Sequence, residues 1–89
     1  MGELVMFYAY ILRSESDPSR LYHGHTSDLR RRLADHNSGD NVSTRHGRPW
    51  VIAWYGAFET EAAAMAFERY LKTASGKAFS RKRLLVLPS

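Results

Sequence analysis

The chain has 89 residues, which is enough for one small domain, and we expect that domain to span residues 1–89. Cysteine is absent, and this excludes disulfides, thiolate metal sites and thiol nucleophiles. The composition is that of a folded globular protein, and the formal net charge of +4 favours a polyanionic partner such as nucleic acid.

The first half of the chain predicts a hairpin followed by a helix. Residues 4–12 are apolar and aromatic, as in a buried strand, and residues 14–19 have the composition of a turn. Residues 20–25 would then return as a second, antiparallel strand. A hydroxyl cap at Thr26 with an acid in the next turn predicts a helix to about Asn37, with Leu29 and Leu33 as its buried stripe.

The second half predicts one more strand and two more helices. Residues 50–58 read as a third strand, and Thr60 as the cap of a helix over 61–73. We expect Ser75-Gly76 to end that helix before a short basic helix over 77–85. The order β-β-α-β-α-α predicts an α+β fold, in which a three-stranded antiparallel sheet is flanked by helices.

The hairpin carries the first candidate site residues. Tyr10 and Tyr22 would lie on neighbouring strands, so that both hydroxyls could reach one face; the alternative is that both are ordinary aromatic sheet residues. Gly24 within a strand indicates either a bulge or the close approach of a phosphate or another chain.

The first predicted helix carries a basic run, Arg30-Arg31-Arg32, part of which must be a solvated face. Arg32 and His36 are four residues apart and share a helix face. Arginine is suited to binding a phosphate, and histidine to binding a phosphate or transferring a proton. His36 could instead cap the end of the helix.

Glu68, in the second predicted helix, is a candidate ligand for a divalent cation. Its alternative role is a surface ion pair with Lys72, four residues further on. The four histidines have no recognisable zinc spacing. No phosphate-binding loop, nucleophile elbow or dinucleotide motif is present.

Together these residues resemble the GIY-YIG nuclease family over roughly residues 6–85. The two motifs would be Tyr8-Ala9-Tyr10 and Tyr22-His23-Gly24. Residues 26–37 are similar to the helix after the second motif in small standalone members, and residues 44–49 to their next loop. Residues 67–72 look like the helix that carries the metal-binding glutamate.

The resemblance implies a role for each matching position. Tyr10 would help to position the attacking water, and Tyr22 would orient that water or act as general base. Arg32 would hold the scissile phosphate, with His36 near the same site. Glu68 would bind one Mg²⁺ or Mn²⁺ ion. We expect the remaining nucleic-acid contacts at Gly24, Arg30, Arg31, Lys72, Lys77 and Arg81.

The chain also departs from the family pattern. Tyr8, Ala9 and His23 replace the Gly, Ile and Ile of the motifs, and we expect the side chains at these positions to alternate away from the two tyrosines. No asparagine follows Asn41, so the role of a late asparagine near the metal is vacant or taken by another residue.

The resulting hypothesis is a metal-dependent endonuclease that hydrolyses nucleic-acid phosphodiester bonds, with DNA as the expected substrate. One alternative is a non-catalytic nucleic-acid-binding module of the same fold. Another is a protein-interaction domain with Trp50, Trp54 and Tyr55 as an exposed anchor. With no separate targeting domain in 89 residues, we expect weak sequence specificity or a partner protein. Because the sequence has neither a membrane-length apolar run nor a secretory signal, we expect no membrane association and a cytoplasmic location.

Overall fold

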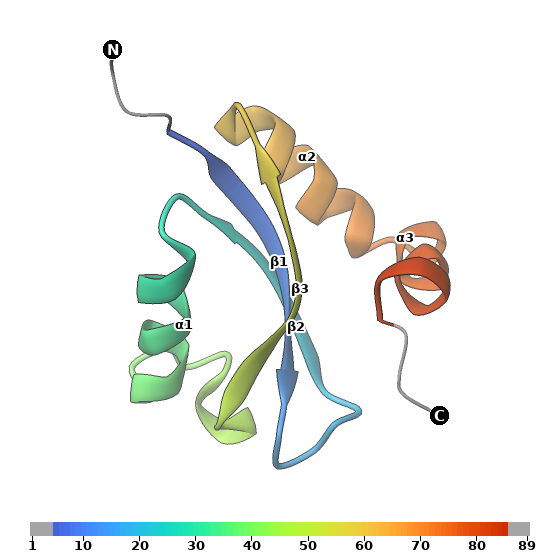
Figure 1. Ribbon diagram of the computed structural model, residues 1–89. Helices are drawn as coiled ribbons and strands as arrows, with labels where there is room; N and C mark the ends of the chain where they lie inside the picture. The colour runs from blue at the N-terminus through green and yellow to red at the C-terminus, as the bar shows by residue number, and fades with distance from the viewer. Residues whose placement is uncertain (1–4, 86–89) are drawn as a thin grey trace.

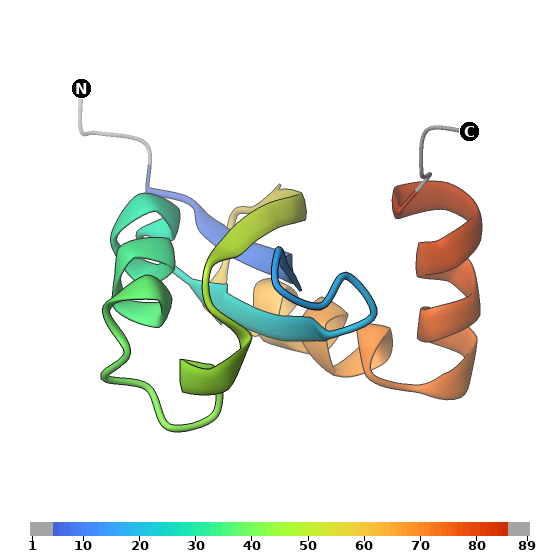
Figure 2. The same ribbon diagram turned by 90° about the horizontal axis from the view of Figure 1, so that it is seen from below.

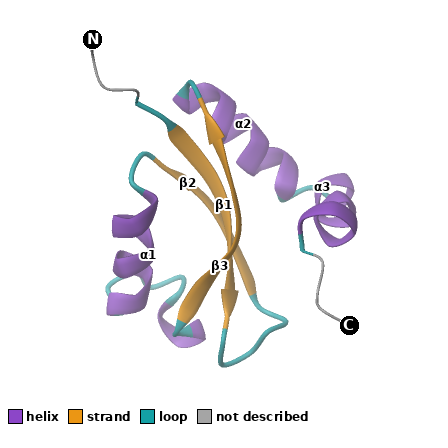
Figure 3. Ribbon diagram, in the orientation of Figure 1, coloured by secondary structure: helices purple, strands orange, loops and turns teal. Residues whose placement is uncertain are grey.

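The structure, a computed structural model, describes residues 5–85 and has the element order that the sequence predicts. The chain begins with strands β1 (Phe7–Ser14) and β2 (Leu21–Thr26) and helix α1 (Leu29–Ser38). A 3₁₀ turn, η1 (Arg45–Gly47), precedes strand β3 (Trp50–Phe58). Helices α2 (Glu61–Leu71) and α3 (Ala74–Phe79) follow, and α3 continues into a π-helical turn, η2 (Ser80–Leu84). Figure 3 distinguishes these helices and strands by colour.

The three strands form one antiparallel sheet in the order β2-β1-β3, which confirms the predicted α+β architecture. The most buried strand, β1, is central, with Ala9, Ile11 and Leu12 fully buried. Strand β2 lies at one edge of the sheet. Figures 1 and 2 show α1 on one side of the sheet and α2 with α3 on the other.

The face of the sheet under α1 holds a core of Tyr10, Leu12 and Trp50. Leu29 and Leu33 of α1 pack against it, which confirms the predicted buried stripe. Trp50 is only 3% exposed, so it cannot belong to an exposed interaction anchor.

The opposite face packs against α2, where Ala64 and Leu71 are buried. The ring of Phe67 lies 5.5 Å from that of Trp54. A register shift in the pairing of β1 with β3 leaves one extra residue in β3, so that Ile52 faces α1 while Trp54 faces α2. Of the proposed aromatic anchor, only Tyr55 is largely exposed, at 54%.

Several predicted element ends are wrong by a few residues. The first strand begins at Phe7, and Leu4 lies outside the described residues. Helix α1 is capped by Asp28, whose Oδ1 accepts from the Arg31 amide at 3.1 Å, because Thr26 is still part of β2. The cap of α2 at Thr60 is confirmed.

The predicted break at Ser75-Gly76 is also wrong. Helix α2 ends at Leu71, and Thr73 caps α3 by accepting from the Gly76 amide at 3.0 Å. Gly76 lies inside α3, where a side chain would collide with the backbone of Tyr70 and Leu71. The glycine therefore permits close packing of two helices and does not end one. None of the helices between residues 5 and 85 is both long and apolar enough to cross a membrane.

Candidate active site

Tyr10 lies at the centre of the candidate site. It is 1% exposed, on the α1 face of the central strand, and its hydroxyl oxygen lies 3.0 Å from Nε2 of His36. Gly24 of β2 pairs directly with Tyr10, and a Cβ at position 24 would collide with the phenol ring. The β1–β2 register is regular at Gly24, so the predicted bulge is wrong, and the group that approaches this glycine closely is the side chain of Tyr10.

His36 is fully buried in the last turn of α1 and is held at both ring nitrogens. Its Nδ1 lies 2.8 Å from Oγ1 of Thr44, whose carbonyl accepts from the indole of Trp50 at 2.7 Å. The imidazole is thus fixed in the core and does not cap the last carbonyls of the helix, a role that the sequence had left open. Burial and nearby Arg32 lower the pKa of His36, which favours the neutral ring.

Arg32, one helical turn before His36, extends beside both motif tyrosines. Its pKa is raised first by hydrogen bonding to Tyr10 and also by contact with Tyr22. Arg32 therefore lies beside the Tyr10 hydroxyl, whose oxygen is 3.0 Å from Nε2 of His36. The side chain of Arg32 remains 34% exposed, so an incoming phosphate can reach it.

Tyr22 completes this cluster from the edge strand. It pairs with Leu12 and lies on the same sheet face as Tyr10, and its ring centroid is 4.7 Å from that of His36. Burial raises the pKa of Tyr10, and Arg32 opposes that rise. The structure therefore brings together Tyr10, Tyr22, Arg32 and His36, the four residues that the sequence identified as catalytic candidates.

Glu68 lies on α2, the helix that covers the opposite face of the sheet. Its Oε1 lies 3.0 Å from Nδ1 of His25, and its Oε2 lies 3.3 Å from Nζ of Lys72. The surface pair with Lys72 is thus present, but the carboxylate is only 17% exposed and has a second partner. Among the effects that raise the pKa of Tyr10, the negative charge of Glu68 is the smallest.

Comparison with known proteins decides the family. The family model described as the GIY-YIG catalytic domain matches residues 6–83. This chain belongs to the GIY-YIG family. The match runs from β1 through most of η2 and so includes both tyrosine motifs and Glu68.

Individual relatives are similar to the chain over most of its length. The chain is 39% identical over 66 residues to UPF0213 protein SpyM50708 of Streptococcus pyogenes serotype M5, covering 73% of this chain and 70% of the relative. UPF0213 protein SPs0786 of Streptococcus pyogenes serotype M3 matches to the same extent. The solution structure of UPF0213 protein BH0048 from Bacillus halodurans is 30% identical, with a TM-score of 0.48, and the match covers 82% of this chain and 79% of that one.

The GIY-YIG motif residues that differ here do not all point away from the tyrosines. Ala9 and His23 alternate away, as expected, but Tyr8 is two residues from Tyr10 in the same strand and therefore shares its face. The ring of Tyr8 lies 6.0 Å from that of Tyr55 in an edge-to-face arrangement. Tyr8 extends the aromatic surface beside the cluster, which the sequence did not predict.

His25 is the site residue that sequence reasoning missed. It was considered only as part of a zinc site with His23, and the contact with Glu68 spans 43 positions of the chain. The alternation of side chains along the strand could have indicated which face His25 lies on. His25 is three residues from Tyr22, so it faces the helix that follows β3 and not the tyrosine cluster.

The chemistry of Glu68 fits a hard divalent cation. Mg²⁺ is commonly held by one or two carboxylates, with water and substrate phosphate oxygens completing its shell. Within residues 5–85, no group of three or more His, Asp or Glu side chains could form an all-protein site. A single carboxylate that shares the ion with a phosphate is the arrangement that these residues allow.

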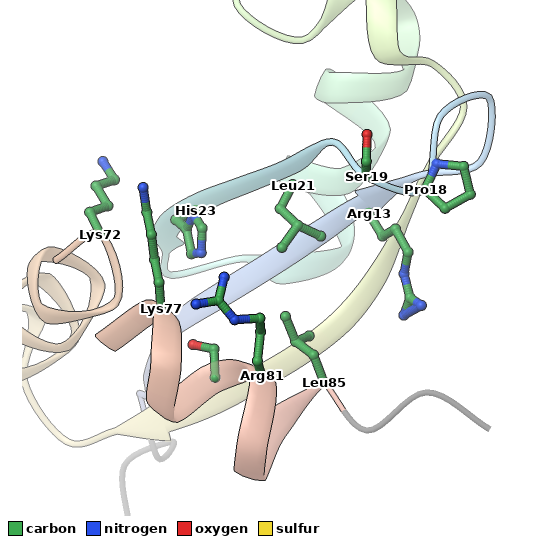
Figure 4. Close-up of a pocket in the computed structure, with 10 residues that line it drawn as sticks. Arg13, Pro18, Ser19, Leu21, His23, Lys72, Lys77, Arg81 and Leu85 are labelled. Carbon is green, nitrogen blue, oxygen red and sulfur yellow. The ribbon is translucent and has the colours of Figure 1, made fainter. Parts of the chain in front are cut away.

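The residues expected to contact nucleic acid are distributed over two regions. Arg30 and Arg31 are exposed on α1. Lys72, Lys77 and Arg81 instead line a cleft beside α3, on the face of the sheet opposite to the tyrosine cluster (Figure 4). Gly24 is buried, so at most its backbone is available to a ligand.

Proposed function

We propose that this GIY-YIG domain is a divalent-metal-dependent endonuclease that hydrolyses nucleic-acid phosphodiester bonds, with DNA as the expected substrate. The observation that carries the proposal is the convergence of Tyr10, Tyr22 and Arg32 around the buried imidazole of His36. A structural core alone requires neither an arginine beside two phenols nor a buried histidine held at both nitrogens.

The proposed roles follow from donor chemistry. Arg32 would hold the scissile phosphate through its planar fork and stabilise the charge that develops on it. A water polarised by the Tyr22 hydroxyl would attack phosphorus and lose one proton to solvent. The bond to the leaving oxygen would break, and that oxygen would take up a proton from solvent. Tyr10 and His36 would fix the geometry of the site, because the Tyr10 hydroxyl lies 3.0 Å from the imidazole and beside Arg32.

Glu68 would hold the metal, and the ion when bound would supply positive charge to the phosphate and leaving oxygen. To bind the ion, Glu68 would have to give up one of its two present partners, His25 or Lys72. Lys72 is 54% exposed and can move into solvent, whereas His25 can continue to orient the other carboxylate oxygen.

The test is incubation of purified protein with labelled duplex DNA, branched and single-stranded DNA, and RNA. Each substrate is offered with Mg²⁺, with Mn²⁺ and with EDTA. We expect cleavage with either metal and none with EDTA. Cleavage that survives in EDTA would overturn the metal requirement, and cleavage of RNA alone would overturn the assignment to DNA.

A second function, nucleic-acid binding without cleavage, is favoured by one observation. Both carboxylate oxygens of Glu68 already have cationic or hydrogen-bonding partners, His25 and Lys72. If neither gives way, the chain would bind nucleic acid through its basic helices and cut nothing. Salt-sensitive binding without cleavage under any metal condition would identify that function.

A further inference from the structure

A cleft separate from the tyrosine cluster lies between the β1–β2 hairpin and the segment formed by α3 and η2. Its volume is about 540 Å³, and it opens on the face of the sheet opposite to Tyr10. Figure 4 shows Lys77 and Arg81 extending from the helical wall toward the hairpin, where Leu21 and His23 lie. Pro18 and Ser19 form its end at the hairpin turn.

The charged residues that line the cleft are all basic. Four of its lining residues are cations, Arg13, Lys72, Lys77 and Arg81, and none is acidic. Within residues 5–85, the ion pairs engage Lys72 but not the other three. Burial lowers the pKa of His23, and the neighbouring Lys72 and Lys77 lower it further. Positive potential therefore extends into the cleft.

Three of the other six lining residues are apolar. Leu21 is 38% exposed although it lies on a strand, and Leu85 and Pro18 add to the same surface. A single strand of nucleic acid presents a matching pair of surfaces, because its phosphates are anionic and its unpaired bases have apolar faces. A cavity of this size is typical of sites that enclose one small ligand or nucleotide-sized group. A duplex, with two paired backbones, would contact only the rims.

The cleft also leads to the candidate metal site. Lys72 lines it, and Nζ of the same residue lies 3.3 Å from Oε2 of Glu68. The edge strand β2 separates the cleft from the tyrosine cluster, with Tyr22 on one face and His23 on the other. A nucleic-acid strand lying in the cleft would therefore pass next to Glu68.

We infer that this cleft binds an unpaired strand of the nucleic-acid substrate next to the scissile phosphate. The inference rests on the proposed nuclease function and specifies its substrate class, a nucleic acid with a single-stranded overhang or flap beside the cleavage position. Lys77 and Arg81 contact the backbone of that strand, and the apolar residues contact its bases.

The test compares two double variants that remove the same charge. Lys77→Ala/Arg81→Ala changes the cleft, whereas Lys82→Ala/Arg83→Ala changes neighbouring exposed residues of η2 that do not line it. Binding of a fluorescent single-stranded oligonucleotide is measured by anisotropy in EDTA over a series of salt concentrations. We expect about tenfold weaker binding for the cleft variant and a log–log salt slope shallower by about 1.4, which corresponds to two lost phosphate contacts. The control should stay close to wild type.

Equal losses in the two variants, or no loss in either, would overturn the inference. Because the altered side chains are exposed, circular dichroism should show both variants folded, and Lys77→Gln/Arg81→Gln provides a second pair with longer side chains.

A cleavage assay separates failure of the cleft from failure of the proposed function. We expect wild type to cut a duplex with a single-stranded flap faster than a blunt duplex, and the cleft variant to lose that preference. If the wild type cuts no substrate, but the cleft variant binds the single strand more weakly than the wild type and the control variant does not, the proposed hydrolysis is overturned and the binding role of the cleft is supported. A wild type that cuts flap and blunt duplex equally, with both variants binding alike, would overturn the cleft and support hydrolysis.

Discussion

Gly24 lies directly opposite Tyr10 in the β1–β2 pairing, and the phenol ring of Tyr10 fills the space that a side chain at position 24 would need. The atoms in conflict are the hydroxyl oxygen and the outer ring carbons. Because that hydroxyl lies 3.0 Å from Nε2 of the buried His36, the ring cannot move without breaking this contact. The glycine of the second motif is thus required by the tyrosine of the first.

The first prediction concerns Gly24→Ala. Overpacking a buried position usually costs about 1–3 kcal/mol, and we expect a loss of that size in the free energy of unfolding, measured by urea denaturation. The matched comparison is the same change in a Tyr10→Leu background, where the conflicting atoms are gone. The cost of the alanine should then fall well below its cost in the wild type. An unchanged cost would mean that the phenol does not select glycine.

The second prediction is a pH dependence of stability from His36. Its folded-state pKa is lowered from the ordinary value of 6.5 by burial and by Arg32, so below about pH 6.5 the unfolded chain binds the proton more readily. Stability from the neutral ring is therefore complete above the unfolded-state pKa and is lost as the pH falls through the folded-state pKa.

The measurement is the free energy of unfolding from neutral pH down to mildly acidic pH, across the ordinary histidine pKa of 6.5. We expect it to decrease toward acid pH in the wild type, and less steeply in His36→Phe. His46→Gln, at an exposed histidine, serves as the control and should keep the wild-type slope. Identical slopes for the wild type and His36→Phe would contradict the prediction.

The third prediction separates Arg32 from its basic neighbours. Arg32→Ala should lower the rate of metal-dependent cleavage by about a hundredfold or more, because it removes a donor that stabilises the phosphate. Arg31→Ala, an exposed change of the same size and charge on the same helix, should have only a small effect. Single-turnover rates at saturating protein measure both. Equal effects would mean that the arginines act only as a basic surface.

Sequence reasoning recovered most of the fold because the apolar pattern carries it. The apolar, aromatic-rich strands and the Leu29–Leu33 stripe predict the sheet and α1 without any knowledge of tertiary contacts. The errors arose where one residue type can have two structural roles. Gly76 was interpreted as a helix break, but its role is to allow α3 to approach the backbone of α2.

The candidate site could be predicted only in part. Spacing placed Arg32 and His36 on one helix face, and the family resemblance connected them with the tyrosines. The contact of His25 with Glu68 could not be read from spacing, since it joins an edge strand to a helix across a sheet face. The cleft beside α3 could not be predicted from the sequence either, because its two walls come from distant parts of the chain.

The fourth prediction treats His25 as a positioning residue for Glu68. Loss of a group that orients a metal ligand typically costs about 10–100-fold in metal affinity or activity. We expect His25→Ala to raise the Mn²⁺ concentration needed for half-maximal cleavage by about that factor, with a smaller effect at saturating metal. His23→Ala, on the same face of β2 but without a hydrogen bond or ion pair to Glu68 among the described residues, should leave that concentration unchanged. A shift common to both variants would indicate a general effect on β2.

The last prediction concerns the competition between Lys72 and a metal ion for Glu68. Glu68→Gln retains the size of the side chain but removes the charge that a hard cation needs, so cleavage should fall to background while folding and nucleic-acid binding largely survive. Lys72→Ala removes the cation that now lies 3.3 Å from Oε2. If the ion must displace this lysine, Lys72→Ala should bind Mn²⁺ more tightly than the wild type, as measured by titration calorimetry without nucleic acid.

If Glu68 and Lys72 form only a structural ion pair, the two substitutions should give a different result. A merely structural ion pair on a helix is worth about a few tenths of a kcal/mol, so both substitutions would then change stability slightly and leave cleavage intact. The matched control for the lost charge is Arg69→Ala, because Arg69 is an exposed cation of the same helix that makes no ion pair within residues 5–85. If a folded Glu68→Gln protein cuts at the wild-type rate, Glu68 is not the metal ligand. Lys72 would then have no metal ion to compete with.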